Sequence, residues 1–150
     1  MKIERIDHIH LHVRDLEKAI QRFEDLLGVR FGEVMSDELG ADLLVKATYA
    51  PLGIDESQGI DVSQPTSPSS PVAKVIERKG EGLVGGVSFK VADIETAIAE
   101  FQAKGMKLLG RQQVGNLKQA WFHPRDAYGL FVEFCEYQAH NALAAARGES

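Results

Sequence analysis

The sequence has few of the features that mark secreted, membrane or nucleic-acid-binding proteins. Its 150 residues include one cysteine, Cys135, so no internal disulfide can form. No apolar run approaches the ~20 residues of a membrane-spanning helix, and the N-terminus has no hydrophobic signal segment. The 17 basic residues are outnumbered by 22 acidic ones and form no basic run, which argues against nucleic acid as a partner. We therefore expect a cytoplasmic protein that binds neither membranes nor nucleic acid.

The remaining composition is that of a globular protein. Hydrophobic residues make up 44% of the chain and charged residues 26%, with a net charge of −5. A chain of this length can bury a substantial core. We expect a single domain over residues 1–150.

An alternating segment near the N-terminus is the most informative part of the chain. In residues 6–15, histidines occupy positions 8, 10 and 12, and apolar residues occupy positions 9, 11 and 13. Side chains at i and i+2 of a strand share a face. This strand therefore presents three imidazoles on one face and packs the other on a core. A face with three histidines is either solvated or part of a site.

The same pattern returns 78 positions later, which indicates an internal duplication. An apolar strand, an aspartate and a helix with apolar periodicity follow one another in both places. The matching pairs are Val13/Val91, Asp15/Asp93, Glu17/Glu95, Ala19/Ala97, Ile20/Ile98 and Phe23/Phe101.

Periodicity and capping residues predict two βαβββ modules joined by a linker helix. Module one spans about 3–65, with a strand, a helix and three further strands at 3–13, 16–27, 31–35, 42–49 and 60–63. The linker spans 66–80 and contains a helix that begins after Ser70 and ends at Gly80. Module two spans about 83–137, with a strand, a helix and three strands at 84–91, 93–104, 107–113, 117–122 and 129–136. The tail, 138–150, is either a short helix or a frayed terminus.

Several short motifs, in their order and spacing, resemble the vicinal oxygen chelate superfamily, and most closely its methylmalonyl-CoA epimerase-like branch. They are Ile-Asp-His-Ile at 6–9, the linker helix with Gly-Leu at 70–83, Phe-His-Pro at 122–124 and the closing strand at 129–136. The resemblance covers roughly 5–137. It implies an α+β fold in which the two modules form a curved sheet around a central cavity.

The resemblance also implies a site for a divalent metal ion. Metal-using members hold the ion with two residues from each module. His8 falls on the first ligand position, Asp61 on the second and Glu133 on the last, whereas Gly86 takes the place of the remaining histidine. This ligand set suits Zn, Mn, Co, Ni or Fe. His8 and Glu133 could instead form a metal-free hydrogen-bonded pair.

Further candidates follow from position and parity. Lys46 falls where the epimerases carry a catalytic glutamate, so it is either an inward residue that stabilises an enolate or an ordinary solvated lysine. His10 and His12 either bind substrate or line a wet strand face. Gln119 and Trp121 share one face of their strand and are candidate substrate-binding residues.

The resemblance implies two functions of different class. One is a metal-assisted isomerase or lyase that stabilises the enolate of a small oxygenated acid or acyl thioester, with Glu133 and Lys46 as catalytic residues. The alternative is a metal-free protein of the bleomycin-resistance type that binds a small molecule. Unpaired strand edges in this fold favour a homodimer.

Overall fold

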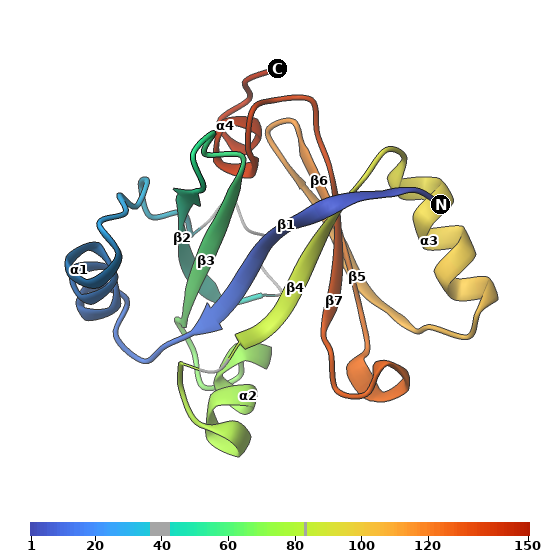
Figure 1. The fold of residues 1–150 in the computed structure, drawn as a ribbon. Helices are drawn as coiled ribbons and strands as arrows, with labels where there is room; N and C mark the ends of the chain where they lie inside the picture. The colour runs from blue at the N-terminus through green and yellow to red at the C-terminus, as the bar shows by residue number, and fades with distance from the viewer. Residues whose placement is uncertain (37–42, 83) are drawn as a thin grey trace. The chain divides into compact units, whose positions relative to one another are not determined.

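The computed structural model describes residues 1–36, 43–82 and 84–150. Seven strands and four α-helices lie in these ranges (Figure 1). In chain order the elements are β1 (Ile3–His12), α1 (Leu16–Leu27), β2 (Val45–Leu52), β3 (Gln58–Pro65), α2 (Pro71–Lys79), β4 (Val84–Val91), α3 (Ile94–Ala103), β5 (Leu108–Val114), β6 (Leu117–Phe122), the 3-10 helix η2 (Pro124–Ala127), β7 (Val132–Glu136) and α4 (Ala142–Ala146). None of the helices in the described part of the chain has the length and apolar character to cross a membrane.

The chain forms two compact units, and β1 contributes to both. We call Ile9–Gly85 the first unit, and Met1–His8 together with Gly86–Ser150 the second unit. The strand order is β2-β3-β1 in the first unit and β1-β4-β7-β6-β5 in the second. The predicted α+β class and the repeated order of strand, helix and strands are confirmed.

In the first unit, α1 covers one face of the strands. Asp15 caps the helix by accepting the Lys18 N–H at 3.1 Å, and Gly28 ends it in the left-handed conformation, as the sequence predicted. The alternation in β1 places Leu11 and Val13 in the core with Leu16. The other members of this cluster are Ile60 and Val62, with Ile9, Ala19, Ile20, Phe23, Phe31 and Leu52 packed against them.

Two strand predictions in the first unit need correction. The strand expected at 31–35 is reduced to an isolated bridge between Met35 and Ala47, although Gly32 also donates its N–H to the Tyr49 carbonyl at 2.9 Å. β2 continues through Pro51 to Leu52 instead of ending at residue 49, because β2 is the terminal strand of the sheet order, where a proline is tolerated. Pro51 and Leu52 pair with Gly59 and Gln58 beside the turn that joins β2 to β3. The start of this predicted strand, residue 42, lies outside the described residues.

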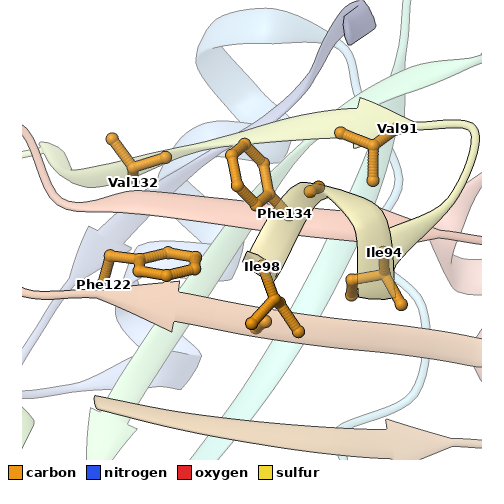
Figure 2. Close-up of a cluster of buried hydrophobic side chains, with 8 residues drawn as sticks. Val91, Ile94, Ile98, Phe122, Val132 and Phe134 are labelled. Carbon is orange, nitrogen blue, oxygen red and sulfur yellow. The ribbon is translucent and has the colours of Figure 1, made fainter. Parts of the chain in front are cut away.

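In the second unit, α3 plays the role that α1 plays in the first. Asp93 caps it by accepting the Thr96 N–H at 2.7 Å. Its apolar residues pack against alternate residues of β4, β6 and β7, as Figure 2 shows for Val91, Ile94, Ile98, Phe122, Val132 and Phe134. The rings of Phe101, Phe122 and Phe134 meet edge to face, with centroids 4.7 to 5.4 Å apart.

The C-terminal tail is ordered rather than frayed. Asn141 caps α4 by accepting the Ala144 N–H at 2.9 Å, and α4 buries Ala142, Leu143 and Ala145. Asn116, in the turn between β5 and β6, donates its side-chain N–H to the Gly148 carbonyl at 2.8 Å. The tail therefore forms a short helix that is supported by three buried apolar side chains and by side-chain hydrogen bonds to its backbone.

Truncation of Phe134 tests the core of the second unit. Phe134 is fully buried, so Phe134→Ala removes its ring from two aromatic contacts and leaves a cavity. We expect the free energy of unfolding to fall by about 3–5 kcal/mol, as measured by urea denaturation. Tyr128→Ala is the control, because Tyr128 is fully exposed and its truncation should change stability by less than about 0.5 kcal/mol. Equal losses in the two variants would contradict this description of the core.

Candidate functional site

The second unit buries a cluster of polar side chains on the sheet face opposite α3. Because alternate residues point to opposite faces, the residues between the core positions of β4, β6 and β7 lie on this second face. Cross-strand register places Ser88 beside Glu133, and Glu133 beside Trp121. Asp7 and Glu133 are 0% and 5% exposed, respectively. Buried carboxylates must be paired or hydrogen-bonded, so their partners indicate what the cluster can do.

His8 lies between two buried carboxylates. Its Nδ1 is 2.8 Å from Asp7 Oδ2, and its Nε2 is 3.4 Å from Glu133 Oε1. Burial raises the pKa of Asp7, but the hydrogen bond and charge of His8, with contributions from Tyr137 and Arg5, outweigh it and hold this pKa below its usual value. Asp7 is therefore a carboxylate and only accepts, so His8 Nδ1 donates. The other ring nitrogen, Nε2, faces Glu133 Oε1.

Asp7 is held by two further residues. Tyr137 donates its hydroxyl to Asp7 Oδ1, and Arg5 Nη2 lies 3.4 Å from the same oxygen. Arg5 Nη2 also donates to the Tyr137 hydroxyl at 2.9 Å. Burial, followed by the hydrogen bond to Asp7 and its charge, raises the pKa of Tyr137, so the phenol stays protonated and remains a donor.

Glu133 is held by a chain of two amides. Gln119 Nε2 donates to Glu133 Oε1 at 2.8 Å, and Gln112 Nε2 donates to Gln119 Oε1 at 2.8 Å. The two amides are thus oriented in series, each with its amino group toward the next acceptor. Gln119 was predicted to bind substrate, a role that these contacts with Glu133 and Gln112 leave untested. Trp121 is half-buried, and its ring packs over Gly110, which leaves its predicted substrate role untested.

The first unit contains a second, smaller group of polar side chains. His10 Nδ1 is 3.4 Å from Asp61 Oδ1, which also accepts the Ser63 hydroxyl at 3.0 Å. His12 is half-buried, with no hydrogen-bond partner for Nδ1 among the described residues. Burial, and secondarily the charge of His10, lower the pKa of His12 to about 4. The structure thus brings the predicted residues His10 and Asp61 together within this unit.

Lys46 does not lie where the sequence interpretation placed it. In the β2–β3 register Lys46 pairs with Gln64 and Thr48 with Val62, whereas Asp61 pairs with Tyr49 on the other face. The face of Val62 is the one that α1 covers. The Asp15 carboxylate at the start of α1 has a lowered pKa, chiefly through the Lys18 N–H and partly through the charge of Lys46. Lys46 is therefore a half-buried residue on the face of the sheet that α1 covers. The inward orientation that was predicted for a catalytic lysine is wrong, because Asp61 lies on the opposite face.

Gly86 allows a close approach of backbone rather than an open space. A Cβ built at Gly86 would lie 2.4 Å from the carbonyl oxygen of Phe131, which accepts the Val87 N–H at 3.0 Å. At the neighbouring Gly85, a Cβ would lie 2.5 Å from the ring of His12. The two glycines therefore permit the close approach of neighbouring groups and do not open additional space on the strand.

Sequence reasoning did not identify Asp7, Arg5, Tyr137 or Gln112 as site residues. Strict alternation in β1 places Asp7 and His8 on opposite faces, yet both are buried and in contact. Tyr137 lies two and four residues after Cys135 and Glu133, so alternation along the chain places all three on the same face. This spacing could have identified Tyr137 as a site residue. Cys135 itself is fully buried, and burial raises the pKa of its thiol, which disfavours the reactive thiolate.

Comparison with known proteins gives consistent matches over most of the chain. A sequence profile described as the Glyoxalase/Bleomycin resistance protein/Dioxygenase superfamily matches residues 7–122. Mitochondrial methylmalonyl-CoA epimerase of Mus musculus is 26% identical over 136 residues, covering 88% of this chain and 72% of that protein. Ethylmalonyl-CoA/methylmalonyl-CoA epimerase of Cereibacter sphaeroides is 27% identical over 135 residues, covering 87% and 96%.

Solved structures share the fold. A Streptomyces coelicolor methylmalonyl-CoA epimerase variant in complex with 2-nitronate-propionyl-CoA superposes with a TM-score of 0.81. The match covers 92% of this chain and 100% of that one, at 22% identity. At this identity the likeness concerns the fold alone.

Substitutions at the two glycines distinguish backbone from side-chain contacts. We expect Gly86→Ala to lower the free energy of unfolding by about 1–3 kcal/mol, because its new methyl group meets a backbone carbonyl. We expect Gly85→Ala to be relieved by His12→Ala, which removes the ring that the methyl group meets. In double-mutant cycles by urea denaturation, the Gly85–His12 pair should couple more strongly than Gly86→Ala with Phe131→Ala. Full relief of Gly86→Ala by Phe131→Ala would contradict the backbone contact.

His12 should make the protein less stable in acid. Its pKa is lowered from 6.5 to about 4 in the folded state, so the unfolded chain takes up the proton first. Neutral His12 therefore leaves the free energy of unfolding unreduced well above pH 6.5. As the pH falls from 6.5 toward 4, the free energy of unfolding decreases, by about 2 kcal/mol at pH 5. The wild type should therefore lose about 2 kcal/mol more than His12→Gln between pH 7.5 and 5, measured by urea denaturation. The exposed His140→Gln is the control, and identical pH profiles for all three proteins would refute the assignment.

Proposed function

Because the chain belongs to the glyoxalase/bleomycin resistance/dioxygenase superfamily, as its motifs predicted, we propose that it is a divalent-metal-dependent isomerase of a small acyl thioester or related oxygenated acid. The reaction removes a proton from the carbon beside a carbonyl group and returns it, with an enolate between the two steps. The names of the relatives, which are epimerases of acyl-CoA substrates, support this substrate class. They favour an isomerase over a lyase, the other reaction that the sequence allowed.

The observation that carries the proposal is the hydrogen bond between Asp7 and His8 beside Glu133. A histidine that binds a metal ion donates its other N–H to a carboxylate or carbonyl, which fixes the tautomer and the ring. His8 has this partner at 2.8 Å, and its Nε2 converges with Glu133 Oε1. One imidazole nitrogen and one carboxylate oxygen, both buried, are a donor set that suits a divalent transition metal. We propose that His8 and Glu133 hold the ion.

The residues of the second unit prepare this chemistry. A bound divalent cation would polarise the substrate oxygens and stabilise the charge of the enolate. Gln119 holds Glu133 Oε1, so the carboxylate keeps one direction. The burial of His8 and Glu133 keeps water from them, and a lower effective dielectric strengthens their interaction with any charge placed between them.

The candidates of the first unit remain predictions. Asp61 keeps its predicted role as a metal ligand, and His10 and His12 keep theirs as substrate-binding residues. The contact of His10 with Asp61 supports a joint role for these two side chains. Lys46 is left out of the proposal because of its position on the helix side of the sheet. The homodimer and the cytoplasmic location also remain predictions.

A metal-free binding protein of the bleomycin-resistance type is the second candidate. It is favoured by Gly86, since the fourth ligand position of the family has no donor and is closed by the Phe131 carbonyl. The two candidates differ in whether His8 and Glu133 bind an ion and in whether a substrate exchanges its proton.

Metal content and proton exchange test the proposal together. We expect about one Co, Mn, Ni or Zn ion per chain in the loaded wild-type protein, as measured by elemental analysis, and none in His8→Ala. We expect the loaded wild type to catalyse deuterium exchange into the carbon between the two carbonyl groups of methylmalonyl-CoA, followed by mass spectrometry. Glu133→Gln should slow this exchange by at least ~100-fold. His140→Ala, which removes an exposed imidazole, should retain both metal and activity.

The outcomes separate the two candidates. Absence of an ion from the loaded wild type would refute the metal-dependent isomerase. Stoichiometric metal without exchange on methylmalonyl-CoA or on a panel of acyl thioesters would refute the isomerase but keep the metal site. Tight thioester binding without metal or exchange would establish the binding protein instead.

A further inference from the structure

We propose that Tyr137 is a positioning residue, which acts through Asp7 to set the tautomer and direction of the His8 ring. The proposal rests on the function proposed above, because it concerns how His8 is prepared as a ligand. All of its residues belong to the second unit, and Tyr137 itself touches neither His8 nor Glu133 in the contacts that define the cluster.

The two oxygens of Asp7 have different partners. Oδ2 accepts from His8 Nδ1 at 2.8 Å, and Oδ1 accepts from the Tyr137 hydroxyl. Because each oxygen has its own donor, the carboxylate cannot rotate about its Cβ–Cγ bond without losing both bonds. The position of Oδ2, and with it the direction of the imidazole, therefore depends on the Tyr137 hydroxyl.

The hydroxyl, rather than the ring, carries this role. Tyr137 is 3% exposed, and its ring is packed below Lys90 Nζ, which lies 4.4 Å from the ring centroid. A phenylalanine would fill the same space and keep this cation–π contact. Asp7 Oδ1 would then keep Arg5 Nη2 at 3.4 Å, a longer contact from a side chain that is 29% exposed. The thiol of Cys135, which also interacts with Asp7, is a much weaker donor than the Tyr137 hydroxyl. Arg5 would also lose the phenol oxygen to which it donates.

The position of Tyr137 in the chain links the two proposed ligands. It follows β7 by one residue and lies four residues after Glu133, whereas Asp7 directly precedes His8 on β1. The hydrogen bond between Tyr137 and Asp7 therefore fixes β1 to the end of β7 close to both ligands. A shift between these segments would change the 3.4 Å separation of His8 Nε2 and Glu133 Oε1.

The first test compares Tyr137→Phe with the wild type by Co²⁺ binding. We expect Co²⁺ affinity, measured by isothermal titration calorimetry, to fall about 10-fold, within the range known for lost outer-shell contacts. We expect the visible spectrum of the Co²⁺ protein to shift, because the direction of a ligand changes. Asp7→Asn should have a larger effect on both readouts. Tyr128→Phe, which removes an exposed hydroxyl, is the matched control and should bind Co²⁺ as the wild type does.

The second test needs no metal. Nitrogen-15 NMR of the histidine rings in the metal-free wild type should show a proton on His8 Nδ1, the atom that donates to Asp7, with His8→Gln used to assign the signals. In Tyr137→Phe we expect only part of the His8 rings to keep the proton on Nδ1. A wild-type His8 ring without a proton on Nδ1 would overturn the proposal, whether or not Tyr137→Phe folds.

The failure of this proposal differs from the failure of the proposed function. If Tyr137→Phe keeps the wild-type Co²⁺ affinity, spectrum and tautomer, Tyr137 is only a packing residue and the metal site stands. If the wild type binds no Co²⁺, the proposed function fails, and the NMR experiment alone decides whether Tyr137 sets the His8 ring. A loss of stability in Tyr137→Phe with unchanged spectrum and tautomer would likewise overturn the positioning role.

Discussion

A strand has two faces, and one helix can cover only one of them. This constraint organises both units of the chain. α3 takes the apolar residues of β4, β6 and β7, and α1 takes those of β3 and the end of β1. The opposite face is left for polar residues, which in the second unit are nevertheless buried. Buried polar groups must satisfy one another, so this face became a connected hydrogen-bonded network rather than a set of separate side chains.

Much of the fold could be predicted because its signals are local. An aspartate before a run of residues with helical apolar periodicity was enough to predict α1 and α3. The proline after Ser70 was enough to predict where α2 begins. The predictions that failed concern segments whose structure depends on contacts distant in sequence. The segment near Met35 bonds to β2 through irregular backbone, which side-chain alternation cannot reveal. Helix α4 depends on capping by Asn141 and on carbonyls that meet the β5–β6 turn, and its composition alone left two alternatives.

In the candidate site, too, residues with local sequence signals could be predicted and residues that depend on strand register could not. Strand parity and family motif singled out His8, Glu133 and Gln119, and these side chains lie together in the second unit, while their roles remain predictions. Parity alone could not decide which face of β2 carries Lys46, because that depends on the register with β3. Asp7 was missed for a related reason. A twisted strand allows neighbouring residues to be buried together, and alternation assumes that they are not.

Gly86 limits how this part of the sheet can be redesigned. The backbone oxygen and the ring of Phe131 occupy the volume that a side chain at position 86 would need. A larger residue there cannot be accommodated by a new rotamer of Phe131 alone, since the backbone that carries it must also move away. An engineer who wishes to place a polar side chain at position 86 must therefore rebuild the segment before β7 at the same time.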